Sequence, residues 1–162
     1  MSDEHERSLA WIDERIAGGH AFRELADAAV RHLRARHPHY DWVGIYMLEA
    51  ASLRLWAWDG PAATEHVEIP LGRGICGYAA TSGETINVPD VNQDDRYLQC
   101  FLGTRSELVV PIAQEDRVFG EVDIDSDRAG AFDGEDEAFV QAFCRRLGGV
   151  AARERLAWRV VT

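Results

Sequence analysis

The sequence contains no lysine, and all 17 of its basic residues are arginine. The glycine-rich segment at residues 72–77 therefore cannot be a P-loop, whose lysine binds phosphates, and its spacing does not fit a dinucleotide-binding fingerprint. No apolar run approaches the length of a membrane span, and the N-terminus lacks the basic and then apolar pattern of a signal peptide. We therefore expect a cytoplasmic protein that has no membrane partner.

Positive charge and cysteine are also scarce. The formal net charge is −11, which opposes binding to nucleic acid or to an anionic membrane. The three cysteines are an odd number, unlike the disulfide framework of a secreted protein, so reduced thiols are expected. A length of 162 residues and a hydrophobic content of 46% are enough for one domain over 1–162, with an N-terminal helix in 1–19 and a core in 20–158.

The periodicity of apolar residues predicts an α+β fold. Helices are expected over 4–17, about 20–36, about 75–82, and from a cap at Asp133 to about 158. Short β-rich runs predict strands over 40–48, 52–58, 66–70, 85–88, 106–112 and 117–125. This order indicates a single antiparallel sheet with helices packed on one face. A ligand pocket is expected on the other face, closed by residues 72–82 and 89–105.

Three acidic residues fall on one face of the last predicted hairpin. Alternation puts Glu107 on the same side as Asp123 and Asp125, and a three-residue loop at 114–116 would pair Glu107 with Asp123. Like charges opposite one another destabilise a sheet and raise one another's pKa values. The pattern therefore indicates a bound cation or a reaction that needs a proton, and a simply solvated sheet face is the alternative.

Other residues that can carry chemistry have structural alternatives. Cys76 follows the glycine-rich turn at the start of a helix, where backbone amides can lower a thiol pKa, but it can equally be a packed core residue. Cys144 on the last helix is predicted to lie in the core or an interface. The histidines near the end of the second helix lack a cysteine or carboxylate at metal-ligand spacing and are interpreted as surface residues: His32, His37 and His39.

The chain resembles a GAF domain, and within that family it is similar to the free methionine-(R)-sulfoxide reductases. The resemblance covers roughly residues 22–155. It rests on Cys100 and on four segments: Asp-Trp-Val-Gly-Ile-Tyr (41–46), Ile-Pro-Leu-Gly-Arg-Gly-Ile-Cys-Gly (69–77), Ser-Glu-Leu-Val-Val-Pro (106–111) and Gly-Glu-Val-Asp-Ile-Asp-Ser (120–126).

The resemblance implies a role for each matching residue. Cys100 would be the nucleophile, and Cys76 would be a second cysteine able to resolve its oxidised form. Three acids would hold the substrate and assist protonation of the sulfoxide oxygen, and two aromatic residues would form a wall of the site: Glu107, Asp123 and Asp125, with Trp42 and Tyr46. Arg73 or Arg105 is expected to offset the effect of the acids on a thiolate.

The implied reaction is thiol-dependent reduction of free L-methionine-(R)-sulfoxide to L-methionine, through a sulfenic acid and then a disulfide. A thioredoxin-type protein would restore the thiols, with no bound cofactor or metal. A homodimer that acts in oxidative stress is expected. Two positions depart from the family: His66 stands near the place of a resolving cysteine, and Phe101 follows Cys100 where the family often has aspartate. Cys76 or an external thiol would then form the disulfide.

Two other functions fit the same residues. One is a non-enzymatic GAF sensor that binds a small molecule and undergoes no redox change. The other is a divalent-cation site at the three acids, whose hard oxygen atoms suit such an ion.

Overall fold

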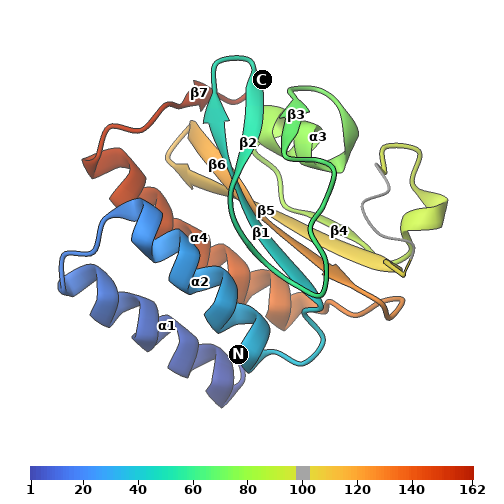
Figure 1. Ribbon diagram of the computed structural model, residues 1–162, viewed down its shortest axis with the longest axis horizontal. Helices are drawn as coiled ribbons and strands as arrows, with labels where there is room; N and C mark the ends of the chain where they lie inside the picture. The colour runs from blue at the N-terminus through green and yellow to red at the C-terminus, as the bar shows by residue number, and fades with distance from the viewer. Residues whose placement is uncertain (98–102) are drawn as a thin grey trace.

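The structure of the chain is a computed structural model that describes residues 1–97 and 103–162. Within these residues, seven strands form one antiparallel sheet in the order β3-β2-β1-β6-β5-β4, and β7 pairs with β6 (Figure 1). The elements in chain order are α1 (Asp3–Ala17), α2 (Phe22–Arg36), β1 (Trp42–Glu49), β2 (Ser52–Asp59), β3 (Glu68–Pro70), α3 (Gly74–Ser82), β4 (Ile86–Val88), a 3-10 turn η1 (Val91–Gln93), β5 (Ser106–Gln114), β6 (Arg117–Ser126), α4 (Gly134–Arg153) and β7 (Arg159–Val160).

The sheet separates two layers. Helices α2 and α4 pack against one face, with α1 against both of them, and the short helix α3 lies on the opposite face (Figure 1). This arrangement confirms the predicted α+β class, with the long helices on one face of an antiparallel sheet. Among the described residues, no helix combines the length and the apolar composition that crossing a lipid bilayer requires.

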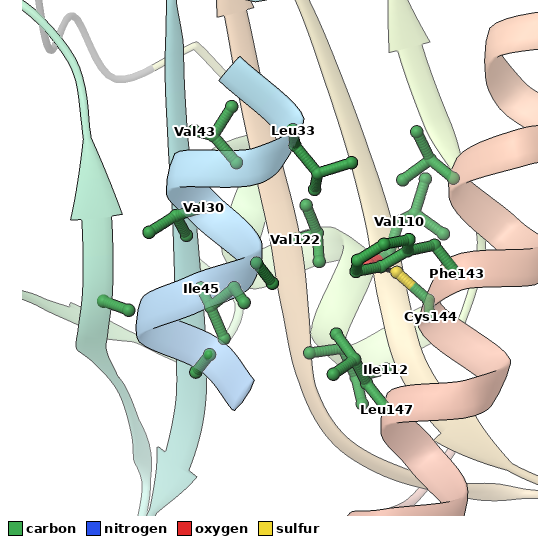
Figure 2. Close-up of a cluster of buried hydrophobic side chains, with 14 of the residues drawn as sticks. Val30, Leu33, Val43, Ile45, Val110, Ile112, Val122, Phe143, Cys144 and Leu147 are labelled. Atoms are coloured by element: carbon green, nitrogen blue, oxygen red, sulfur yellow. Dashed lines mark hydrogen bonds between the residues drawn. The ribbon is translucent and has the colours of Figure 1, made fainter. Parts of the chain in front are cut away.

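The larger hydrophobic core lies between the sheet and the three long helices. Alternate residues of β1, β5 and β6 point into it and meet apolar side chains of α2 and α4 (Figure 2). Burying each large aliphatic or aromatic side chain stabilises the fold by roughly 1.5–3 kcal/mol. Cys144 belongs to this core, where its Sγ lies 3.6 Å from the carbonyl oxygen of Val110, as the prediction of a core position required.

Helix α4 ends earlier than the periodicity predicts. Its N-terminus is capped by Asp133, whose side chain accepts hydrogen bonds from the backbone of Glu135 and Asp136. The helix ends at Arg153 instead of about 158, because Arg155 has a φ of 57° and turns the chain away from the helix axis. The following residues form β7, which pairs with β6 and was not predicted.

The hairpin of β5 and β6 has a different register from the predicted one. Glu107 lies opposite Asp125, not Asp123, because only two residues separate the paired Gln114 and Arg117. A two-residue turn alone would put Glu107 opposite Ile124, but a bulge leaves Phe119 without a partner and shifts the register by one residue. The carboxylates therefore still share one face of the sheet.

The interpretation of His37 as a surface residue is wrong. Helix α1 covers it, so that only 3% of the residue is exposed, and its ring stacks against those of Tyr40 and His5. The Ser8 hydroxyl lies 3.2 Å from its Nε2 and 2.9 Å from Nε2 of His32. Burial lowers the pKa of His37 to about 4, so the ring is neutral near pH 7 and serves the packing of α1.

Candidate active site

The sheet face under α3 carries the acidic residues in three cross-strand rows. Strand β6 lies between β1 and β5, so each of its outward residues has one neighbour on either side. Every second residue of β1 and of β6 points to this face, so the pairing of the two strands brings aromatic and acidic side chains together. From β1 through β6 to β5, the rows are Trp42–Asp125–Glu107, Gly44–Asp123–Val109 and Tyr46–Glu121–Pro111.

This face is buried and not solvated. The exposed fractions are 4% for Glu107, 0% for Glu121, 1% for Asp123 and 2% for Asp125. Helix α3 covers the face with a second hydrophobic core formed by small and aliphatic side chains together with Trp42 and Tyr46. The alternative of a solvated sheet face is therefore excluded for these four residues.

Cys76 meets the acidic residues from α3. Its Sγ lies 3.5 Å from Oδ2 of Asp123, and one ligand atom each of Cys76, Glu107 and Asp123 lie within 4.8 Å of one another. Gly77 allows this position, because a Cβ there would lie 3.0 Å from the backbone nitrogen of Gly72. The glycine-rich segment thus brings the start of α3 close to the preceding turn.

The environment of Cys76 disfavours its thiolate. Burial raises the pKa of the thiol well above its usual value, and the charges of Asp123 and Glu121 act in the same direction. The prediction that the helix N-terminus lowers this pKa is wrong, because burial and the carboxylates dominate. Arg73 and Arg105 are both exposed, and their expected effect on the thiolate of Cys100 stays a prediction, because Cys100 lies outside the described residues.

Burial also raises the pKa values of Glu121, Asp123 and Asp125. For Asp123, hydrogen bonds with Glu107 and Cys76 and the nearby His66 act against that rise. Both carboxylate oxygens of Asp125 lack a hydrogen-bond partner among the described residues, as does Oδ1 of Asp123, and those of Glu121 meet no nitrogen or oxygen donor there, only the thiol of Cys76. Buried polar groups without partners cost roughly 1–3 kcal/mol each, so their presence points to a ligand that supplies the missing contacts.

Trp42 forms a wall beside Asp125. Its ring lies so close to the backbone of Gly44 and of Gly60 that a Cβ at either glycine would clash with it, and it stacks on Trp58 with 6.4 Å between ring centroids. Glycine at position 44 thus allows the close approach of the indole ring of Trp42. Tyr46 is fully buried, and its hydroxyl donates a hydrogen bond of 2.7 Å to the carbonyl oxygen of His66.

A cavity of about 290 Å³ opens beside this wall. Residues that line it include Arg34, Asp41, Trp42, Thr104 and Asp125. It therefore joins a guanidinium group, an indole and one of the buried carboxylates, which suits a small molecule with charged and apolar parts.

Sequence reasoning about the site was incomplete in two respects. Cys100, the predicted nucleophile, and Phe101 lie outside the described residues, so the structure gives no geometry for either. Glu121 was not predicted as a site residue, although strand alternation puts it on the face of Asp123 and Asp125. The available signal was its place in the alternation of acidic residues along the strand, two positions before Asp123 and four before Asp125.

Comparison with known proteins agrees with this geometry. The GAF domain family matches residues 21–150. The free methionine-R-sulfoxide reductase of Escherichia coli is 35% identical over 112 residues, which are 69% of this chain and 67% of that protein.

Two solved structures extend the likeness to the fold. The type II free methionine-R-sulfoxide reductase of Thermoplasma acidophilum is 40% identical, with a TM-score of 0.76 over 82% of this chain and 96% of that one. The free methionine-R-sulfoxide reductase of Neisseria meningitidis, solved in complex with its substrate, is 28% identical, with a TM-score of 0.85 over 96% of both chains. The chain therefore belongs to the GAF domain family, and within that family it is similar to the free methionine-R-sulfoxide reductases.

Proposed function

We propose that this protein is an oxidoreductase that reduces free methionine-R-sulfoxide to methionine with its own thiols. The observation that carries the proposal is the group of buried carboxylates beside Cys76, in a chain similar to reductases of this substrate. Neither a sensor nor a structural domain needs a thiol against several buried acids, whereas reduction of a sulfoxide needs both a thiol and a proton source.

The substrate is a zwitterion with an apolar chain, and the site offers a partner for each part. Its ammonium group pairs with the buried carboxylates, since Asp125 and Oδ1 of Asp123 have no hydrogen-bond partner in the part of the chain that the structure describes. Its methyl and methylene groups pack against Trp42, and Arg34 at the cavity offers a cation to its carboxylate. A free amino acid uses all three contacts, which favours it over a residue within a polypeptide.

The reaction begins at Cys100. Its sulfur attacks the sulfoxide sulfur, and a carboxyl group of the site donates a proton to the departing oxygen. The oxygen is transferred to Cys100 as a sulfenic acid, while the substrate sulfur gains two electrons and leaves as methionine. The acidic surroundings suit the proton transfer, since burial raises the pKa values of Asp123 and Asp125 and so favours their protonated forms.

Cys76 completes the cycle. Its thiol attacks the sulfenic sulfur of Cys100, a disulfide forms, and water leaves; a thioredoxin-type dithiol then reduces the disulfide. His66 stands where the family often has another resolving cysteine, and it is close enough to Asp123 to lower the pKa of that carboxyl. We therefore assign the resolving role to Cys76, in a protein that works in a reducing compartment such as the cytoplasm.

The test is single-turnover chemistry with purified R and S epimers of methionine sulfoxide, read by mass spectrometry of the methionine released and of the protein. Wild-type protein should release one methionine per chain from the R epimer and form a Cys76–Cys100 disulfide. Cys100→Ser should abolish release, whereas Cys76→Ser should allow one release and leave a sulfenic acid that dimedone traps.

Cys144→Ser is the matched control, because Cys144 lies in the core on the other side of the sheet. It should release methionine as the wild type does. Release that survives Cys100→Ser refutes the assigned nucleophile. Stable binding of the sulfoxide without any change of thiol content would favour the sensor function instead.

A further inference from the structure

Three potential metal ligands, each from a different element, meet between α3 and the sheet face that it covers. Cys76 comes from α3, Glu107 from β5 and Asp123 from β6, and their ligand atoms lie within 4.8 Å of one another. All three residues are buried, with exposed fractions of 6%, 4% and 1%. A mixed set of one sulfur and two carboxylate oxygens at this spacing is what a small metal ion requires.

A second observation points to a missing cation. Oδ1 of Asp123 is buried without a hydrogen-bond partner among the described residues, and the two oxygens of Glu121 meet no nitrogen or oxygen donor there, only the thiol of Cys76. Glu121 is fully buried, and its carboxylate is close enough to act on the Cys76 thiol, so it lies next to the three potential ligands. In the part of the chain that the structure describes, no arginine forms an ion pair with Glu121 or Asp123.

We propose that the reduced, substrate-free protein binds one zinc ion through Cys76, Glu107 and Asp123, with Glu121 or water as the fourth ligand. Zinc is of borderline softness, accepts both thiolate and carboxylate ligands, and prefers four of them. Calcium and magnesium prefer oxygen ligands alone, so the sulfur disfavours them. An ammonium group gains little from the thiol, and the thiol therefore distinguishes a metal site from a site built only for an amino acid.

Binding involves no change of oxidation state. The zinc ion displaces the proton of the Cys76 thiol, which is released to solvent, and the thiolate becomes a ligand. A bound ion would occupy the carboxylates and hold the sulfur of Cys76, so that zinc and the substrate exclude each other. Only this competition rests on the proposed reductase function; the metal site itself does not.

The test is a titration of fully reduced, chelator-treated protein with zinc against a competing chromophoric chelator. Cadmium, titrated in parallel, reports a metal–thiolate bond by its ultraviolet charge-transfer absorption. One ion per chain and one thiolate signal are expected. Cys76→Ser should remove the thiolate signal and weaken zinc binding at least about 100-fold, since even the partners of metal ligands cost 10–100-fold. Asp123→Asn should weaken binding while the thiolate signal remains.

Cys144→Ser is the control, because Cys144 lies in the core on the other side of the sheet, and it should keep the stoichiometry and the thiolate signal. Thermal melts of each variant verify folding before titration. A thiolate signal that survives Cys76→Ser, or zinc affinity equal in wild type, Cys76→Ser and Asp123→Asn, would overturn the proposal. Methionine-R-sulfoxide should lower the apparent zinc affinity; if zinc binds as expected and the sulfoxide has no effect, the metal site stands and the proposed substrate falls.

Discussion

Glu121→Met tests whether the buried acids cost the fold stability. Glu121 is fully buried, and among the described residues its carboxylate oxygens meet no nitrogen or oxygen donor, only the weakly donating thiol of Cys76. Methionine has a similar length and no charge, and it would contact Tyr46 and Pro111 across the strands, as glutamate does now. The substitution therefore removes an unsatisfied polar group and leaves little change in volume.

The expected gain follows from the cost of burial. A buried polar group without a good partner costs about 1–3 kcal/mol, and burial raises the pKa of Glu121, so the group removed is a desolvated carboxyl group. We expect Glu121→Met to raise the free energy of unfolding by about 2 kcal/mol. For a chain of this size that corresponds to an increase in Tm of roughly 4–8 °C.

The assay is urea unfolding at neutral pH in metal-free buffer, followed by circular dichroism and fluorescence. Glu65→Met is the matched control, because Glu65 is exposed, and it should change the free energy by less than about 0.5 kcal/mol. Glu121→Gln should gain little, since the amide leaves a buried polar group in the same place. A Glu121→Met protein less stable than the wild type would refute the reasoning, because the carboxylate would then have a favourable partner.

Three further predictions concern the rest of the molecule. Gly148→Ala should destabilise by about 1–3 kcal/mol, because its Cβ would strike the carbonyl oxygen of Ala113, whereas Gly149→Ala on the same helix meets nothing and should stabilise by about 0.5–1 kcal/mol in urea unfolding. The pKa of His37 falls to about 4 in the folded state, so the unfolded chain binds more protons at this residue below pH 6.5; the contribution of His37 to stability should be constant above that pH and decline by up to about 3 kcal/mol as the pH falls to 4, so that stability declines less in His37→Gln. Sedimentation velocity should give the mass of a homodimer, and a single species of 18.1 kDa would contradict that expectation.

Strand alternation alone was enough to assign the faces of the sheet. A period of two puts Val43 and Ile45 into the core and Trp42 and Tyr46 on the face of Asp125, as the structure has them. The register was not predictable in the same way, because it depends on a bulge. Packing across the sheet decides whether a strand accommodates an extra residue, and the residue types near position 119 do not predict the bulge.

The burial of a residue by an element distant in the sequence was also not predictable from the local sequence. His37 follows a helix and precedes a proline, which is typical of an exposed helix end, yet α1 covers it through the hydroxyl of Ser8. The same holds for the thiol of Cys76. Its position at a helix N-terminus favours a low pKa, but the effect of the helix is smaller than that of burial next to Asp123. The local sequence around Cys76 indicates a helix N-terminus and its dipole. It does not indicate that the fold places acidic residues of the sheet next to the thiol.

The two hydrophobic cores explain how the fold tolerates so many buried acids. The core between the sheet and the long helices contains none of the four carboxylates and supplies most of the apolar burial, so the opposite face is free to carry groups that destabilise it. Helix α3 covers that face with small side chains such as Ala79 and Ala80. A cation that binds the carboxylates of the folded chain would offset their cost, because a ligand that binds only the folded state stabilises it by RT ln(1 + [L]/Kd). A protein that kept these acids for packing alone would gain stability by losing them, and for that reason a binding function is the simpler explanation of their presence.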